Sequence, residues 1–168
     1  MGPWGNFYFL VGSAAAGLTG LTFIAVTFGS RLITEDKLPY VEAFFSPIAD
    51  HFIQAFVLCA VALVPIAGPR ILGAAIILTT VVRSVQLAHT HRLTKAAAAE
   101  SKDIELSDWV LGVILPAAVY VLFVVTGVLY LLGIPQAPAL FAVSLLFLLV
   151  VALRRAWEMF LWIATKVE

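Results

Sequence analysis

Five long apolar segments constrain this chain more than any other feature of its sequence. They run at about 7–28, 46–66, 70–90, 109–133 and 138–163. A helix needs about 20 apolar residues to cross the hydrocarbon core of a bilayer, so each segment is long enough. Charged residues make up only 12% of the chain, against about 25% in a typical soluble domain. We therefore expect an all-α protein, with residues 1–168 forming a single polytopic bundle of five transmembrane helices. Soluble, disordered, disulfide-framework and nucleic-acid-binding classes are excluded.

Prolines and glycines mark the boundaries of these segments. They separate the second segment from the third at 65–69, and the fourth from the fifth at 133–138. Ser46 followed by Pro47 is typical of a helix N-cap and first helical position. We therefore expect the second helix to begin at Ser46, after a short interfacial stretch at 41–45. No basic stretch precedes the first segment, so we do not expect a cleaved signal peptide.

Positive charges lie almost entirely on one side of the expected bundle. Lysines and arginines near the span ends set the orientation of a membrane protein, with the richer side in the cytoplasm. With five spans, one side holds Arg31, Lys37, Arg92, Lys95, Lys102, Arg154, Arg155 and Lys166, and the other holds only Arg70. We therefore expect the N-terminus outside and the C-terminus in the cytoplasm. Trp4 then fits an outer aromatic belt, and Trp109, Trp157 and Trp162 fit an inner one.

Several polar side chains fall inside the second and third segments. Asp50 and Gln54 follow Ser46 at four-residue spacing, on one face of a helix, with His51 beside them. Arg83 and Gln86 share a face of the next helix with two threonines, Thr79 and Thr90. Asp50 lies 18 residues before the turn near residue 68, and Arg83 lies 15 after it. At about 1.5 Å per residue their depths differ by roughly 5 Å, so we predict that Asp50 and Arg83 pair across the hairpin. The alternative is that the helix dipole stabilises Asp50 while Arg83 reaches the membrane surface along its own stem.

The fourth and fifth segments add a second group of polar candidates. Pro116 predicts a kink in the fourth helix, and Tyr120, one turn further on, carries a hydroxyl that needs a partner inside the membrane. In the fifth, Arg154 and Glu158 stand at the spacing of a helical ion pair, with interfacial anchoring as the alternative. The complete predicted set of polar site residues is Asp50, His51, Gln54, Arg83, Gln86, Tyr120, Arg154, Arg155 and Glu158.

We expect no metal, cofactor or catalytic centre. His51, His89 and His91 are the only histidines, and the last two point to different faces of a helix because they are two residues apart. Cys59 is a small hydrophobe in this setting. A stripe of small residues in the first segment, formed by Ser13, Ala16, Gly17 and Gly20, allows close helix approach. We expect it to pack within the chain, with packing between chains as the alternative.

Three short patterns resemble a group of small bacterial integral membrane proteins of uncharacterised function. The group tends to show F-x-x-P-x-x-x-H-F, D-W-x-x-x-x-x-L-P-x-x-x-Y and H-N-A-W-D in its second, fourth and fifth spans. The first pattern is matched at Phe44, Pro47, His51 and Phe52, and the second at Asp108, Trp109, Leu115, Pro116 and Tyr120. In the third, Arg154 and Arg155 replace His-Asn, and Glu158 replaces the aspartate. The resemblance, over about 10–165, implies a multi-pass protein of the bacterial inner membrane and no established activity.

Function is less constrained than fold. The favoured interpretation is a channel or transport protein acting as a homo-oligomer in the lipid bilayer. The polar set would line its cytoplasmic vestibule, and the apolar outer halves of the helices would form a hydrophobic gate. The alternative is a regulatory or scaffolding protein that binds another membrane protein. A membrane-embedded enzyme is least favoured, because the sequence has no nucleophile elbow, metalloprotease helix or phosphate loop.

His51 adds a hypothesis about regulation. An unperturbed histidine has a pKa of about 6.5 and changes charge near physiological pH. A positive charge at His51 would repel Arg83 and compete with it for Asp50. Ion passage or partner binding would then depend on pH, unless His51 stays neutral and donates a hydrogen bond to a backbone carbonyl.

Overall fold

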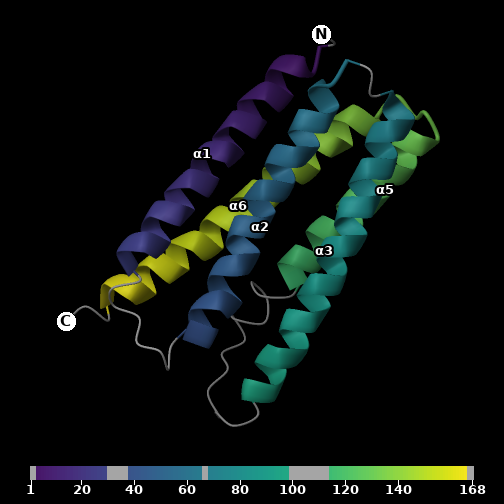
Figure 1. Cartoon of the computed structure of the whole chain (residues 1–168). Coiled ribbons are helices and arrows are strands. Elements are labelled where there is room, and N and C mark those ends of the chain that lie inside the picture. The colour runs from purple at the N-terminus through teal and green to yellow at the C-terminus, as the bar shows by residue number, and fades with distance from the viewer. Residues whose placement is uncertain (1–2, 30–37, 66–67, 99–113, 166–168) are drawn as a thin grey trace.

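The computed structural model describes residues 3–29, 38–65, 68–98 and 114–165, and all regular structure within them is helical. The helices are α1 (Gly5–Gly29), α2 (Leu38–Leu63), α3 (Pro69–Ala98), α5 (Leu115–Leu131) and α6 (Ala137–Thr165). They form an elongated bundle of helices that run up and down in turn (Figure 1). The all-α prediction is therefore confirmed for the described residues.

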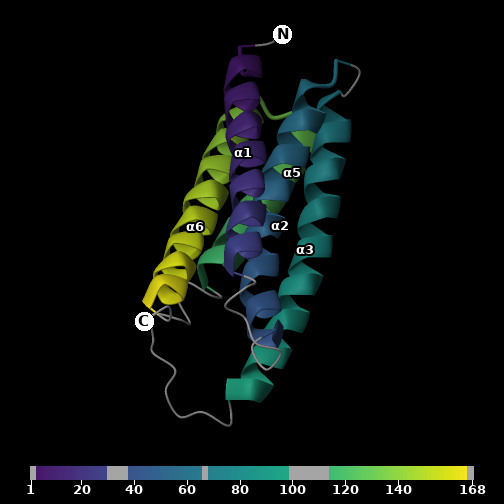
Figure 2. The same cartoon turned by 60° about the vertical axis from the view of Figure 1, so that its left-hand side comes forward.

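The helices pack in a defined order. α1 lies against α2 and α6, α3 lies against α5 and α2, and α5 also contacts α6. Figure 2 shows α1 and α3 on different sides of α2. The N-terminus lies at the same end as the α2–α3 and α5–α6 connections (Figure 1). We call the opposite end, where α1, α3 and α6 finish and α2 and α5 begin, the C-terminal end of the bundle.

The apolar core fills the space between the helices. Phe52 and Leu58 on α2, Phe123 on α5, and Phe141 and Leu145 on α6 are almost completely buried. Closely packed side chains of this size hold the helices together through many small van der Waals contacts. The core is therefore shared by the helices, and none of them forms a separate unit.

Two glycines let α3 and α5 approach closely. A Cβ atom on Gly73 would lie 2.8 Å from the Gly127 carbonyl oxygen, and one on Gly127 would lie 2.6 Å from Ile77 Cγ1. Both distances are too short for real carbon contacts. The two helices are thus held together near their Gly73–Gly127 contact, towards the N-terminal end of the bundle.

Two of the helices are long and apolar enough to cross a membrane, namely Gly5–Thr27 within α1 and Ala137–Glu158 within α6. Ile48–Leu63 and Leu115–Leu131 are shorter apolar helices. Length and composition of the described residues thus identify two candidate spans.

The start of the second helix differs from the prediction. α2 begins at Leu38, eight residues before Ser46, so Pro47 lies inside the helix instead of at its first position. Proline removes one helical hydrogen bond, but it does not end this helix. The interpretation of Ser46-Pro47 as a cap was wrong because capping signals are local, and the helix is already formed before them.

In α5, Pro116 stands in the first turn, where proline is tolerated. The kink predicted at Pro116 is not tested, because residues 109–113 of the predicted span lie outside the described ranges.

Candidate functional site: a polar cluster inside the bundle

An ion pair joins the two helices of the α2–α3 hairpin. Arg83 Nη1 lies 2.8 Å from Asp50 Oδ1, and the same nitrogen donates a hydrogen bond of 2.8 Å to Gln86 Oε1 one turn along α3. The pairing predicted from the depths of the two residues is confirmed. Each charge has its counter-charge at hydrogen-bonding distance, which is the least costly way to hold it away from water.

A histidine and a tyrosine meet directly behind this pair. The Tyr120 hydroxyl lies 3.2 Å from His51 Nε2, and the two rings stack with an interplanar angle of 11°. Either atom can donate, depending on which ring nitrogen carries the proton. The hydroxyl of Tyr120 therefore has the partner that its place inside the bundle requires, and that partner is a side chain of α2.

Gln54 completes the group one helical turn beyond His51. Its side chain is 3% exposed, and neither Nε2 nor Oε1 has a hydrogen-bond partner among the described residues. A buried amide without partners costs about 1–3 kcal/mol. Within the described part of the chain, the Gln54 amide therefore lowers the stability of the fold and gains no hydrogen bond in return.

Charges from three helices act on the Tyr120 hydroxyl. Arg83 and Arg155 act on it as positive charges and Asp50 as a negative one. The five residues Asp50, His51, Gln54, Arg83 and Tyr120 form what we call the inner cluster. Gln86 accepts a hydrogen bond from Arg83, and the charge of Arg155 acts on Tyr120, so seven of the nine predicted site residues belong to the inner cluster or interact with one of its members.

The remaining two predicted residues form a separate pair. Arg154 Nε lies 3.0 Å from Glu158 Oε1, one turn apart on α6, with side-chain exposures of 62% and 41%. The predicted helical pairing is confirmed. Exposed pairs of this kind contribute at most about 1 kcal/mol, so this one marks the surface of α6.

The side chains of the inner cluster differ in how far they are buried. The Asp50 and Arg83 side chains keep exposures of 32% and 20%, whereas Tyr120 is at 7% and His51 at 2%. The ion pair thus lies at the mouth of the cluster, and Gln54 and His51 lie at its closed end. Beyond them, towards the N-terminal end, the core is filled by Phe123, Phe141 and Leu145.

Two polar contacts in the other half of the bundle were not predicted. Thr126 Oγ1 lies 3.3 Å from Ser144 Oγ between α5 and α6, and the Tyr8 hydroxyl lies 3.3 Å from that of Tyr130. The Tyr8 hydroxyl also donates to the Pro138 carbonyl oxygen at 3.4 Å. The depth comparison that placed Asp50 opposite Arg83 could have matched Thr126 with Ser144. That comparison was made for charged residues, and Thr126 and Ser144 are uncharged.

The small-residue stripe of α1 does not pack within the described part of the chain. Ser13, Ala16, Gly17 and Gly20 are all exposed, and no atom lies within 4 Å of a Cβ built on either glycine. Instead α1 contacts α2 through Gly12, which is buried, and a Cβ there would lie 3.0 Å from Cys59 Cβ. The expectation of packing within the chain was wrong, because α1 packs through another face, which carries the buried side chains of Tyr8 and Val11.

The metal prediction concerned histidines that the structure describes only in part. The side chains of His89 and His91 lie outside the described residues, as do Asp108 and Trp109 of the resemblance pattern and the side chain of Trp162. Within the described part, no group of three His, Cys, Asp or Glu side chains is placed to hold a metal ion. Cys59 is a buried free thiol.

No family model matches this sequence, and neither a curated protein nor a solved structure matches it. The chemistry of the site therefore rests on the residues themselves.

Proposed function

We propose that this chain is a multi-pass protein of the bacterial inner membrane, in which all five helices cross the bilayer with the N-terminus outside. Two helices qualify as spans by length and composition. Each of the five also exposes large apolar side chains, for example Phe9, Phe56, Leu78, Val121 and Val150. A helical surface that is apolar all round suits a lipid environment, and the placement of Lys and Arg supports the orientation.

We propose further that the protein acts in membrane transport, with the inner cluster as a cytoplasmic vestibule. The observation that carries this proposal is Gln54, whose amide has no partner among the described residues and lies at the closed end of a cluster whose mouth is the Asp50–Arg83 ion pair. The burial of His51 and Gln54 supports a vestibule within each subunit. This differs from a vestibule at the axis of an oligomer, which would leave these side chains on the outer surface.

The apolar core beyond Gln54 would be the gate. Phe123, Phe141 and Leu145 are completely buried there and come from two helices. A constriction lined by apolar side chains excludes water and ions until its walls separate. The chain thus combines a charged entrance in one half with a closed, uncharged core in the other.

The test is proton flux in liposomes that contain the purified full chain, followed with a pH-sensitive dye inside the vesicles. We expect flux above that of protein-free vesicles, and a fall towards that background in Gln54→Met, which keeps the size of the side chain and removes its amide. Gln136→Met is the matched control, since Gln136 is exposed in the α5–α6 connection. Flux equal to that of empty vesicles, or equal in the two variants, would contradict the proposal.

A second candidate function, association with other membrane helices, is supported by the exposed stripe on α1. Small residues allow helix backbones to approach closely in a membrane, and Gly17 and Gly20 have open space around them. A second copy of the chain or another membrane protein would then cover this face. Gly17→Leu should weaken the self-association measured by energy transfer between labelled copies, and Ala14→Leu, on a flank of the same exposed surface, should leave it unchanged.

A further inference from the structure

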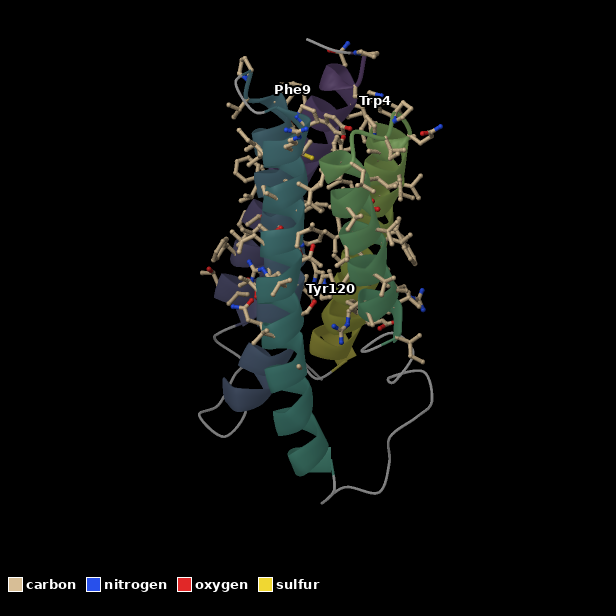
Figure 3. The ribbon with its side chains drawn as sticks, turned by 90° about the vertical axis from the view of Figure 1, so that its right-hand side faces the viewer. Trp4, Phe9 and Tyr120 are labelled. Atoms are coloured by element: carbon tan, nitrogen blue, oxygen red, sulfur yellow. The ribbon has the colours of Figure 1, made fainter. Side chains whose placement is uncertain are left out.

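A groove of about 490 Å³ lies between α3 and α5. Apart from two hydroxyl groups its side chains are apolar, and they belong to Ser84 and Ala88 on α3 and to Ala117, Tyr120, Val121, Val124 and Val125 on α5. Figure 3 shows Tyr120 between these two helices. A cavity of about 150 Å³ already holds a benzene molecule, so the groove has room for an aromatic ring.

The groove follows from the way α3 and α5 pack. The Gly73–Gly127 contact holds the two helices together nearer the N-terminal end of the bundle. Ser84 and Ala88 lie about three and four turns further along α3, and at their level the groove separates the two helices. The space beside Tyr120 therefore results from helix packing, and no side chain of the described residues fills it.

Tyr120 borders both the groove and the inner cluster. It lines the groove, and its ring stacks on that of His51, with the hydroxyl 3.2 Å from His51 Nε2. Of the five residues of the inner cluster, all of which the structure describes, only Tyr120 lines the groove. The Tyr120 ring is therefore the one part of the cluster that has open space next to it.

The closed end of the inner cluster gains from the entry of water. His51 and Gln54 are buried, and the Gln54 amide has no hydrogen-bond partner among the described residues. Gln54 follows His51 by three residues, so the two side chains lie on the same side of α2. Water that reaches His51 is thus within one helical turn of the amide. Hydration of the amide would offset part of the free energy that is needed to separate Tyr120 from His51.

The ring of Tyr120 can leave His51 without a change in the backbone. An aromatic side chain in a helix has two favoured χ1 angles, about 180° and about −60°. A change between them breaks one hydrogen bond and one ring stack. The groove supplies space for the displaced ring, and its apolar side chains Val121 and Val124 suit an aromatic surface.

We propose that the Tyr120 ring is a lid on the closed end of the inner cluster. The lid opens when the ring leaves His51 and turns into the α3–α5 groove, and water then reaches His51 and Gln54 from the mouth of the cluster. This opening is the first step of the transport proposed above and rests on that function, whereas the movement of the ring is measured without transport. The groove is the space for the open lid, and the movement requires no ligand.

The experiment measures how fast diethyl pyrocarbonate, which acylates imidazole rings, modifies His51 of the full chain in detergent. Peptide mass spectrometry distinguishes His51 from the other two histidines. We expect slow modification of the wild type, because the lid is open for only part of the time. Tyr120→Leu should raise the rate about tenfold or more, since it removes both the hydrogen bond and the ring stack. Tyr120→Phe removes only the hydrogen bond, so the rate should rise about two- to tenfold.

Val121→Trp decides whether the ring uses the groove. The larger side chain fills the groove and changes no residue of the inner cluster, so it should keep the lid closed and slow the modification of His51 well below the wild-type rate. Val143→Trp is the matched control, because Val143 is similarly exposed (54% against 63% for Val121) on α6 and does not line the groove. Proton flux in liposomes should fall in Val121→Trp and stay at the wild-type level in Val143→Trp.

Three outcomes would overturn the proposal. The first is equal modification of His51 in the Val121→Trp and Val143→Trp variants, which would mean that the ring does not turn into the groove. The second is complete protection of His51 in the wild type under conditions that modify it in Tyr120→Leu, which would mean that the lid stays closed. The third is full flux in Val121→Trp despite slowed modification, which would separate the lid from transport. The modification rates do not depend on proton flux, so the failure of this inference and the failure of the transport proposal are distinguishable.

Discussion

Arg83 Nη1 lies 2.8 Å from Asp50 Oδ1, across the hairpin formed by α2 and α3. The two residues are 33 positions apart in the sequence, and the turn between them places them at similar depths along the bundle. The Asp50 side chain is 32% exposed and that of Arg83 is 20% exposed. The pair is therefore intermediate between a buried pair, where removing one partner costs about 3–5 kcal/mol, and a surface pair, which contributes at most about 1 kcal/mol.

Asp50→Asn is therefore expected to lower the free energy of unfolding by between about 1 and 3 kcal/mol, because Arg83 keeps its charge and loses its partner. The double variant Asp50→Asn/Arg83→Met should recover much of this loss. Unfolding by sodium dodecyl sulfate, followed by helical circular dichroism, measures both. Equal stability of the single and double variants would show that the residues do not interact. Glu158→Gln, which breaks the exposed pair on α6, is the control and should cost less than about 1 kcal/mol.

Gln54→Met is expected to stabilise the protein while impairing transport. The amide of Gln54 is buried without a partner among the described residues, and its removal should recover part of the cost of about 1–3 kcal/mol that a buried unsatisfied group carries. The same unfolding titration and the flux assay should be run on one preparation. A variant that is less stable than wild type would show that the amide makes essential hydrogen bonds, and a stable variant with full flux would leave Gln54 without a role in transport.

Two glycine-to-alanine changes should have opposite effects on stability. Gly73→Ala places a methyl group 2.8 Å from the Gly127 carbonyl oxygen and 2.9 Å from Tyr130 Cβ, and overpacking of this kind costs about 1–3 kcal/mol. Gly17→Ala meets open space and should stabilise α1 by up to about 1 kcal/mol through helix propensity. The comparison is made by melting temperature in detergent. Similar shifts for both variants would mean that α3 and α5 are not in close contact.

Proton flux is expected to depend on pH through His51. Between about pH 5 and 8 a histidine gains charge as the pH falls. His51 follows Asp50 directly on α2, Asp50 pairs with Arg83 of α3, and Tyr120, on which the charge of Arg155 acts, lies against the His51 ring. Since a positive His51 would compete with Arg83 for Asp50 and loosen the hairpin, flux should rise towards acidic pH. His51→Gln should flatten this profile, and His91→Gln should preserve it. Identical profiles for wild type and His51→Gln would exclude the mechanism.

Single cysteines at residues 101 and 136 should react with membrane-impermeant reagents from opposite sides of the membrane. The background is Cys59→Ala, since Cys59 is the chain's only cysteine. In the proposed orientation, Gln136→Cys reacts in intact cells from outside, and Ser101→Cys reacts only after the inner membrane is opened. Labelling of both from the same side would rule out the five-span topology.

The sequence by itself determined the helical class, the approximate helix positions and the Asp50–Arg83 pair. Apolar segments of about 20 residues leave little choice other than helices that pack together. The pair could be predicted because a short turn fixes which residues of two adjacent helices lie at the same depth, and depth depends only on helical rise. The Arg154–Glu158 pair followed from the same regularity within one helix.

Only the tertiary structure decided which faces meet. The contact of Tyr120 with His51, the isolation of the Gln54 amide and the groove between α3 and α5 all depend on helices that are not adjacent in the chain. The rotation of each helix about its axis is set by the summed packing of many side chains, which a local pattern does not contain. For that reason the small-residue stripe of α1 was wrongly expected to pack within the chain. The start of α2 was placed at a local capping signal, although the helix already begins at Leu38. The geometry of a helix sets its rise per residue, so the depth of a residue can be predicted from the sequence. The rotation of each helix about its axis depends on packing throughout the bundle.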